Sequence, residues 1–377
     1  MRDFSRQSKT QFESASSWLG RLHIDLPLLL LLLTLTSVGV AVLYSASDQS
    51  LATVKRQLSF FAVAYIAMFI VAQFKQETLM RLALPAWIFG VFLLILVEFI
   101  GVGAKGAQRW LALPGLPQFQ PSEVMKLALP IALGTWLQNR QLPPSFKDLV
   151  VAAAIILVPV LLIATQPDLG TSILIAASGL IVILVAGISW KLVFLCIGSL
   201  IAAAPVFWFF LLKEYQKTRI LTLLDPEADR YGAGWNIIQS KIAIGSGGVD
   251  GKGYLSGTQS QLDFLPESHT DFIIAVFAEE WGLTGVLALL TLYLLIIARG
   301  LWIGLNAQET FGRMVAAAVT LTFFVYVFVN MGMVSGLLPV VGVPLPLVSQ
   351  GGTSIVTLMA GFGLLMSIST EKKRLWY

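Results

Sequence analysis

Apolar runs recur along the whole chain, and most are long enough to cross the ~30 Å hydrocarbon core of a bilayer. Only 12% of the 377 residues are charged, against about 25% in ordinary soluble domains. No segment has the composition of a separate soluble domain. We therefore predict an all-α polytopic membrane protein whose ten spans lie near residues 25–46, 57–72, 84–101, 124–138, 149–165, 170–187, 190–212, 272–298, 311–338 and 349–369.

The distribution of Lys and Arg predicts the orientation of these spans, because short cytoplasmic segments are enriched in both. If the N-terminus is cytoplasmic, the short inner segments hold 14 of these residues and the outer segments hold 5. We expect residues 1–24 and 370–377 to be cytoplasmic and 25–369 to form one transmembrane domain. The 213–271 connection, between spans 7 and 8, then faces outward.

The 213–271 connection is the longest stretch outside the predicted spans. Long structureless connections in compact proteins are usually functional, so we expect it to form most of an active site at the membrane surface. Its glycine-rich part, Gly245 to Gly253, is not a phosphate-binding P-loop, because Gly253 follows Lys252 where Ser or Thr is needed. We predict a flexible loop there.

The few cysteines and histidines limit the metal chemistry. The single cysteine, Cys196, excludes an intrachain disulfide, and two histidines with one cysteine argue against a zinc site. The net charge of +4 comes from residues scattered at helix ends, which does not indicate nucleic-acid binding.

Asp271 ends the polar connection immediately before an apolar run. It is either the cap of the next helix or a general base at the lipid–water boundary, where partial burial would raise its pKa; both roles are compatible. His269 tunes this carboxylate or is simply solvated. Glu279 and Glu280 lie inside the following span, where ionisable groups are costly. They are functional or are paired with Lys or Arg of another helix.

Two further acidic positions open predicted spans. Glu123 and Lys126 are three residues apart and share a helix face. They form an ion pair that fixes the helix start, or they line a polar cavity with Lys126 facing an anionic head group. Ser122 is a plausible cap. Asp168 is either a helix cap or a group that orients a sugar or a basic residue.

Basic residues on the predicted outer side oppose the usual topology bias. Binding of a lipid pyrophosphate would explain them, because arginine binds phosphate through two hydrogen bonds. The alternatives are contact with ordinary anionic lipid and, for Arg109, an interfacial anchor beside Trp110. The set comprises Arg56, Lys105, Arg109, Lys217, Arg219 and Lys241.

Residues 339–354 hold three prolines and three glycines in an apolar context, together with Ser349 and Gln350. Irregular backbone at membrane depth survives only where it is buried in protein or lines a wet cavity. The segment indicates a broken or re-entrant region, either lining a functional cavity or packing closely through Gly351 and Gly352.

Six motifs in order resemble the SEDS family of bacterial wall synthesis (shape, elongation, division and sporulation), in particular its rod-shape branch. They cover nearly the whole chain: K-G-A-Q-R-W-L (105–111), Q-P-S-E-V-M-K (120–126), Q-P-D-L-G-T-S (166–172), G-W-N-I-I-Q-S-K-I-A-I-G-S-G-G (234–248), F-L-P-E-S-H-T-D-F (264–272) and P-L-P-L-V-S-Q-G-G-T-S (344–354).

The resemblance implies ten helices and a peptidoglycan glycosyltransferase that polymerises lipid II on the outer face of the bacterial inner membrane. The family's essential aspartate falls on Asp271, and the Glu and Lys of its P-S-E-x-x-K motif fall on Glu123 and Lys126. One departure is Asp229-Arg230-Tyr231, where a proline is expected after the aspartate.

We therefore expect an enzyme of cell elongation with Asp271 as general base. A divalent cation, Mg²⁺ or Mn²⁺, could share the neutralisation of the leaving group, although the sequence shows no compact ligand cluster for it. The implied partners are lipid II, a glycan on undecaprenyl pyrophosphate, a class B penicillin-binding protein, the elongation machinery and membrane lipids. Two alternatives stay open: a lipid II flippase, and a scaffold for the partner transpeptidase. The expected substrate-binding residues are Arg56, Arg109, Glu123, Lys126, Asp168, Arg219, Lys241, His269, Glu280, Ser349 and Gln350.

Overall fold

The computed structural model describes residues 22–104, 107–112, 118–229, 232–258 and 267–371. Within them, eight helices are long and apolar enough to cross a membrane, which confirms a helical membrane protein. These are α3 (Leu26–Ala46), α4 (Leu51–Ala72), α5 (Gln76–Ile100), α7 (Phe146–Thr165), α9 (Trp190–Val206, continued by the π-helix Phe207–Leu211), α13 (Ile273–Asn306), α14 (Thr310–Val334) and α15 (Thr353–Thr370).

Two more helices occupy the remaining expected spans. Helix α8 (Leu169–Val185) is apolar but only 17 residues long, and α6 (Pro121–Gln138) carries Glu123 and Lys126 in its first turns. The count of ten spans therefore stays a prediction. A short hairpin, β1 (Val102–Ala104) with β2 (Ala107–Trp110), is an addition that the all-α prediction did not contain.

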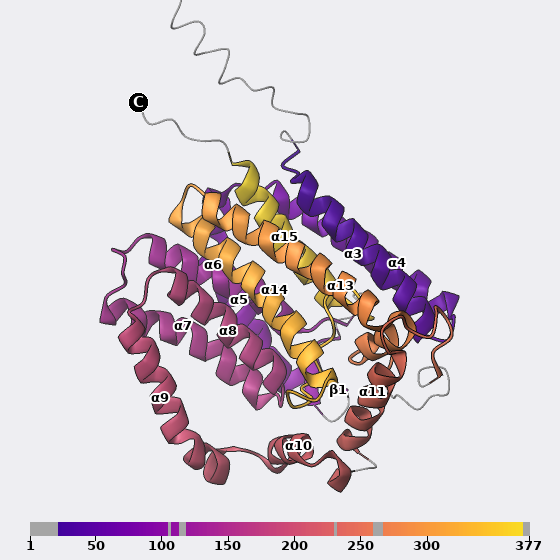
Figure 1. The fold of residues 1–377 in the computed structure, drawn as a ribbon. Helices are drawn as coiled ribbons and strands as arrows, with labels where there is room; N and C mark the ends of the chain where they lie inside the picture. Colours follow the sequence, from indigo (N-terminus) through magenta and orange to yellow (C-terminus); the bar gives the residue numbers. More distant parts are fainter. Residues whose placement is uncertain (1–21, 105–106, 113–117, 230–231, 259–266, 372–377) are drawn as a thin grey trace, which may run out of the picture.

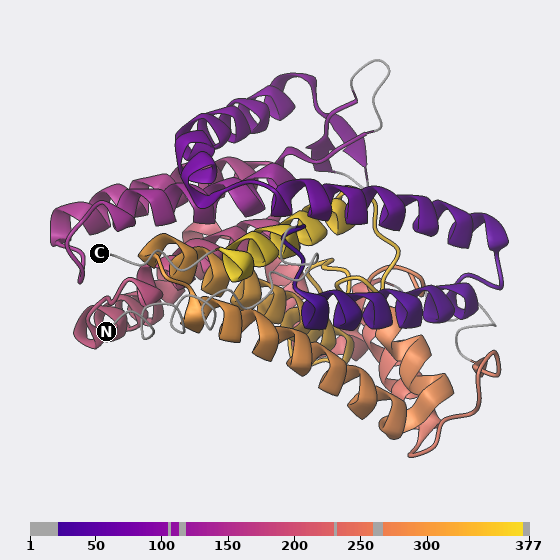
Figure 2. The same cartoon turned by 90° about the horizontal axis from the view of Figure 1, so that it is seen from above.

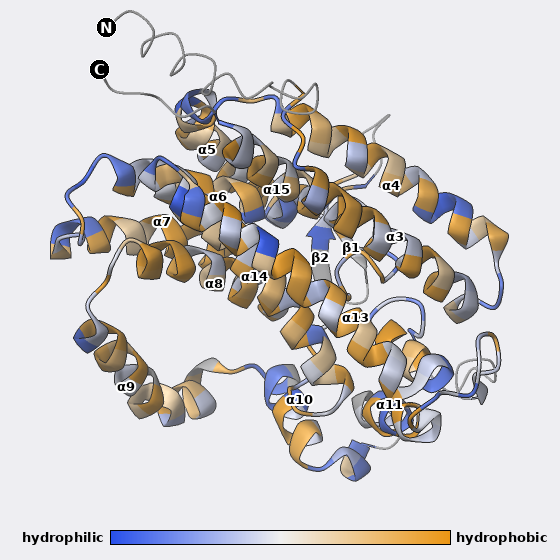
Figure 3. Ribbon diagram, turned by 45° about the horizontal axis from the view of Figure 1, so that its top comes forward, coloured by the Kyte–Doolittle hydropathy of each residue, from blue (hydrophilic) through white to orange (hydrophobic). Residues whose placement is uncertain are grey.

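Helix α14 stands between two groups of packed helices. One apolar core joins α3, α4, α13, α14 and α15, and a second joins α5, α6, α7, α8 and α14. Figures 1 and 2 show α13, α14 and α15 lying between the α3–α4 pair and the α5–α8 group. Helix α9 stands apart and buries none of its side chains within the described structure, so its apolar residues face outward. Figure 3 shows this apolar exterior, as expected for surfaces that meet lipid.

The 213–271 connection is not a structureless loop. It contains α10 (Glu214–Leu224), the 3₁₀ turn Pro226–Asp229 and α11 (Ala233–Gly247). The predicted flexible loop at Gly245–Gly253 is also wrong, because α11 continues to Gly247 and the following residues hydrogen-bond to the backbone of α13. Apolar residues every three or four positions in 233–244 are the signal that the glycines obscured. Arg230, Tyr231 and Lys105 lie outside the described residues.

Between α14 and α15 the chain is irregular, as predicted from its prolines and glycines. Residues 335–352 contain turns but no helix, and Leu347 has a positive φ of 62°. Buried Tyr293 of α13 donates a hydrogen bond to the Pro346 carbonyl at 2.8 Å. This segment, called the broken segment below (335–352), is therefore buried in protein at one side, which satisfies its backbone away from water.

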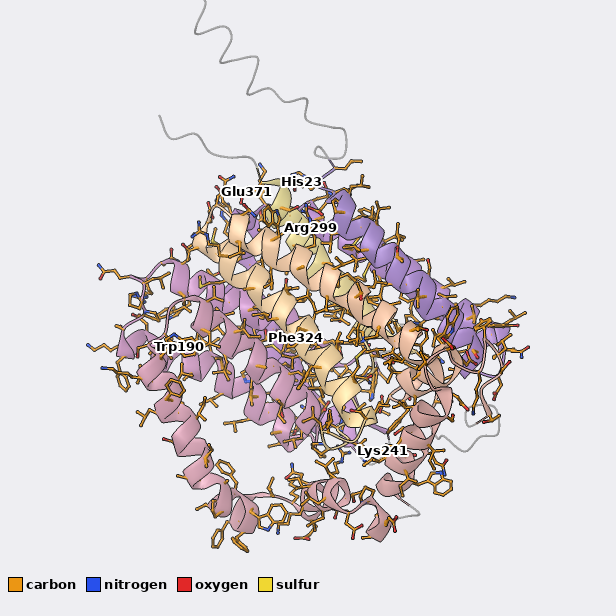
Figure 4. All side chains as sticks on the ribbon, viewed as in Figure 1. His23, Trp190, Lys241, Arg299, Phe324 and Glu371 are labelled. Atoms are coloured by element: carbon orange, nitrogen blue, oxygen red, sulfur yellow. The ribbon has the colours of Figure 1, made fainter. Side chains whose placement is uncertain are left out.

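Helix α13 is interrupted at Gly282, whose φ of 63° and ψ of −165° are not helical. The interruption separates a short stretch, in which residues 273–280 are all buried, from the longer part of the helix that follows Gly282. At the far end of α13, Arg299 pairs with Asp25, the cap of α3, at 2.7 Å. Figure 4 shows Arg299 beside Glu371, so the described chain begins and ends at the same end of the bundle.

Candidate active site

A cavity of about 500 Å³ opens where α6, α8 and α14 meet the broken segment and the turn before α13. Basic residues enter it from two other elements, Arg109 from β2 and Arg219 from α10. The polar lining consists of Arg109, Gln120, Glu123, Lys126, Asp168, Thr171, Arg219, Glu267, Thr270, Asp271, Tyr326, Ser349, Gln350, Thr353 and Ser354.

Asp271 lines this cavity from the turn that precedes α13. Phe272, and not Asp271 as predicted, occupies the cap position of α13, and the Phe272 side chain forms no cap hydrogen bond. The Asn330 side-chain amide donates to the carbonyls of Asp271 at 2.8 Å and Val343 at 2.7 Å. Because Asn330 is fully buried, it fixes the backbone of Asp271 against the broken segment.

Two more bonds fix the same turn. The Ser349 hydroxyl donates to the Thr270 carbonyl at 2.5 Å and accepts from the Leu345 amide at 2.8 Å. The Gln350 amide donates to the His269 carbonyl at 2.9 Å. The broken segment and Asn330 of α14 together therefore hold the main-chain carbonyls of residues 269–271, and none of these bonds uses the Asp271 carboxylate.

Glu123 and Lys126 form the predicted ion pair, with 2.6 Å between Nζ and Oε1. Their side chains are only 8% and 11% exposed, and the Lys126 Nζ lies 4.9 Å from the centre of the Tyr326 ring. The Ser122 cap is wrong: Gln120 is at the cap position, and the Ser122 hydroxyl has no hydrogen-bond partner among the described residues. The pair is formed and it lines the cavity, whereas an anionic head group facing Lys126 stays a prediction.

Asp168 also combines its two predicted roles. One oxygen caps α8 by accepting from the Thr171 amide at 3.2 Å, and the other accepts from the Gln120 side chain at 2.9 Å. Arg109 lies 3.7 Å from the carboxylate and donates to the Pro167 carbonyl at 2.5 Å. Asp168 thus holds Arg109 and Gln120 at the cavity wall.

Four predicted substrate-binding residues are not among the described residues that line this cavity. Arg56 stacks on the Phe60 ring at 5.9 Å, and Lys241 lies on α11 (Figure 4). His269 meets the site only through its carbonyl. Glu280 is buried and accepts a hydrogen bond from Ser45 of α3. It does not line the cavity, because its carboxylate contacts α3 instead.

Several residues that line the cavity or hold Asp271 were missed by sequence reasoning. Tyr326 and Asn330 lie one turn apart in α14, inside a predicted span. The amide of Asn330 in an apolar run was a usable signal, because buried polar groups need partners. Tyr326 gave no signal, since aromatic residues are common in spans. Gln120, Glu267 and Thr270 were inside quoted motifs but were not singled out.

The cavity offers unsatisfied polar atoms to a ligand. Glu123 Oε2 and Arg109 Nε are buried and have no hydrogen-bond partner among the described residues. Buried polar atoms are normally paired, so this cavity suits a polar, partly anionic ligand. Within the described ranges, no group of three or more His, Cys, Asp or Glu side chains is placed to hold a metal ion. These residues do not form a resident metal site, and Mg²⁺ or Mn²⁺ stays a prediction.

A family model described as "Cell cycle protein", for FtsW, RodA and SpoVE proteins, matches residues 19–374. The chain belongs to the FtsW/RodA/SpoVE family. This confirms the SEDS resemblance. The chain is 52% identical over 355 residues to "Peptidoglycan glycosyltransferase MrdB" of Escherichia coli strain K12, covering 94% of this chain and 96% of that one. It is 36% identical to "Probable peptidoglycan glycosyltransferase FtsW" of Trichlorobacter lovleyi, covering 93% and 94%.

Solved structures of FtsW/RodA/SpoVE proteins share the fold. A chain from a peptidoglycan synthase complex, described as coordinating polymerization and crosslinking, is 31% identical, with a TM-score of 0.82 over 92% of this chain and 97% of that one. The rod shape determining protein RodA of Thermus thermophilus is 28% identical, with a TM-score of 0.70 over 92% and 96%. The family members thus share the helical membrane architecture described above.

Proposed function

We propose that the cavity around Asp271 is where this chain polymerises lipid II into β-1,4-linked glycan. The chain is a peptidoglycan glycosyltransferase, as its curated relatives are named along almost their whole lengths. The location rests on one observation. A single cavity is lined by the positioned carboxylate of Asp271 and by three basic side chains, Arg109, Lys126 and Arg219. A glycosyl transfer from a pyrophosphate needs both kinds of group.

In the proposed reaction, Asp271 removes the proton from the 4-hydroxyl of the acceptor GlcNAc. The freed oxygen attacks the anomeric carbon of the donor MurNAc, so the new C–O bond forms as the bond to pyrophosphate breaks. Attack from the opposite face inverts the anomeric carbon and gives a β-link. A general base typically contributes ~10²–10⁴-fold to the rate.

The basic residues stabilise the departing pyrophosphate. Arg109 is directed by Asp168 and the Pro167 carbonyl, which leaves its unpaired Nε for an anion. Arg219 enters the cavity from α10. Arginine suits this role because its guanidinium pairs with two phosphate oxygens at once. Lys126 is shared with Glu123, so it contributes charge while remaining partly neutralised.

The setting follows from the same proposal. We place the chain in the bacterial inner membrane, with the cavity on the outer face, where it serves cell elongation with a class B penicillin-binding protein as transpeptidase. One related structure comes from a peptidoglycan synthase complex, which supports a partner of this kind. The lipid chains of donor and acceptor lie against the apolar exterior of the helices.

A reconstitution experiment tests the proposal against the flippase and scaffold alternatives. Purified protein is given labelled lipid II with its partner transpeptidase, whose own active serine is replaced, and the products are separated by length. Long glycan made only when this chain is present supports the proposal. Lipid II translocation in liposomes without any polymer would support a flippase. Polymer that forms equally well without this chain would reduce it to a scaffold.

A further inference from the structure

The glycine-rich segment 248–253 binds α13 at the point where that helix is interrupted, both through its backbone and through a pair between Lys252 of the segment and Glu279 of the helix. At a helix break, carbonyls before it and amides after it lose their intrahelical partners. The segment supplies four replacement bonds. Before the break, the amides of Lys252 and Gly253 donate to the carbonyls of Glu279 and Glu280, each at 3.0 Å. Beyond the break, the Leu283 and Thr284 amides donate to the carbonyls of Gly248 and Val249, at 3.0 and 3.1 Å.

Glycine is required where the two backbones meet. Gly251 has a φ of 80°, and a Cβ there would lie 2.2 Å from the Glu280 carbonyl oxygen. A Cβ on Gly282, whose φ is 63°, would lie 2.3 Å from the Gly251 amide nitrogen. Side chains cannot be added at this distance without moving backbone. The glycines that suggested a flexible loop therefore permit a close and specific backbone contact.

The buried carboxylate of Glu279 adds a side-chain contact between segment 248–258 and α13. The Glu279 side chain is fully buried, and its Oε1 accepts from the Lys252 ammonium at 2.7 Å, the Thr258 amide at 2.8 Å and the Thr258 hydroxyl at 3.0 Å. A buried carboxylate needs several donors. Here they come from the segment that grips the helix break, so segment 248–258 is tied to the first part of α13.

Asp271 lies in the turn immediately before the other end of this short helical stretch. Residues 272–280 are all buried, and Glu279 lies eight positions after Asp271, which is ~12 Å along a helix axis. Asn330 and Ser349 hold the Asp271 end of this stretch through the carbonyls of Asp271 and Thr270. The other end is held by segment 248–253 and Glu279. A tilt of ~5° over ~12 Å would shift the Asp271 end by ~1 Å.

We propose that segment 248–253, locked by the Lys252–Glu279 pair, is a positioning device that holds Asp271 at its working place in the cavity. None of these residues lines the cavity within the described structure, so they act through the short helix and do not touch substrate. The inference rests on the proposed role of Asp271 as base. A misplacement of ~1 Å in a catalytic group costs up to ~10²-fold in rate.

The test compares Gly251→Ala and Lys252→Met with Gly245→Ala, using lipid II polymerisation by the full-length protein with its partner. Gly245 is a matched control, because it is in α11 close to the segment and a Cβ there meets nothing within 4 Å. We expect Gly251→Ala and Lys252→Met to lower kcat by ~10–100-fold, with KM for lipid II within about twofold of wild type. Gly245→Ala should match wild type. Lys252→Arg keeps the charge and should restore kcat to within about threefold.

A substitution that only destabilises the protein would reduce the amount of folded protein. At equal folded amounts it would not lower kcat selectively while leaving KM unchanged. Wild-type kcat in folded Gly251→Ala or Lys252→Met would overturn the inference, as would a raised KM with unchanged kcat. If Gly251→Ala does not fold, the Lys252 pair of variants decides. Full activity of Asp271→Asn would instead overturn the proposed function. An inactive Asp271→Asn beside fully active Gly251→Ala would overturn the positioning role alone.

Discussion

Replacement of Lys126 by methionine should leave the Glu123 carboxylate buried without its ion-pair partner. The two side chains are 11% and 8% exposed, and the pair is 2.6 Å apart. The second oxygen of Glu123 already has no partner among the described residues. The substitution therefore removes the charge that balances a carboxylate held inside the protein.

The geometry sets the size of the effect. At 2.6 Å and an effective dielectric constant of about 20, the attraction is about 6 kcal/mol, most of which offsets the cost of removing both charges from water. Breaking such a buried pair typically costs about 3–5 kcal/mol. Replacing both charges together should cost much less, because Glu123→Gln with Lys126→Met leaves no buried charge.

Thermal unfolding in detergent measures these differences at a single protein concentration. We expect Lys126→Met to unfold at a clearly lower temperature and the double variant to recover most of the loss. Polymerisation should stay low in both, because both lack Lys126, one of the three basic side chains that line the cavity. A single variant as stable as wild type, or a double variant as unstable as the single one, would refute the electrostatic argument. Recovery of polymerisation in the double variant would leave the pair with a structural role only.

Substitutions at three other positions test how the turn and the cavity wall are held. Asn330→Leu removes the donor to the Asp271 and Val343 carbonyls. We expect the free energy of unfolding, measured by chemical denaturation, to fall by about 1–3 kcal/mol per unsatisfied carbonyl. We also expect a lower kcat. Asp168→Ala should lower the free energy of unfolding by about 1 kcal/mol, because α8 loses its cap. Asp168→Asn should keep the cap but raise KM. Equal stability of the two variants would contradict the capping role. Ser349→Ala should lower kcat ~10-fold at unchanged KM, since it frees the Thr270 carbonyl; a changed KM alone would argue for direct substrate contact.

The sequence was sufficient for the parts of the fold that hydropathy controls. The apolar runs predicted the positions of the helices, and the prolines and glycines of 339–354 predicted irregular backbone, which the structure contains. Asp271, Glu123 and Lys126 come together in one cavity. Spacing alone predicted the contact of Glu123 with Lys126, because it is local to one helix turn.

Long-range geometry was not predictable from one chain. Glu280 and Asp271 are nine residues apart and were assigned to one site, yet the Gly282 interruption and the Ser45 contact direct Glu280 to another face. The glycines of 245–253 suggested flexibility because their role depends on a backbone contact with α13, over 25 residues away in sequence. Tyr326 reaches the cavity only through the packing of α14 against α6, which periodicity does not specify.

The most direct test of the account is the steady-state rate of lipid II polymerisation by Asp271→Asn with its partner transpeptidase, at saturating lipid II and equal folded amounts. Asp48→Asn is a matched control, because Asp48 is exposed and its φ of 52° suits asparagine. The account predicts that Asp271→Asn lowers kcat by ~10²–10⁴-fold with KM little changed, and that Asp48→Asn matches wild type. A kcat near wild type in Asp271→Asn would contradict the assignment of Asp271 as the base.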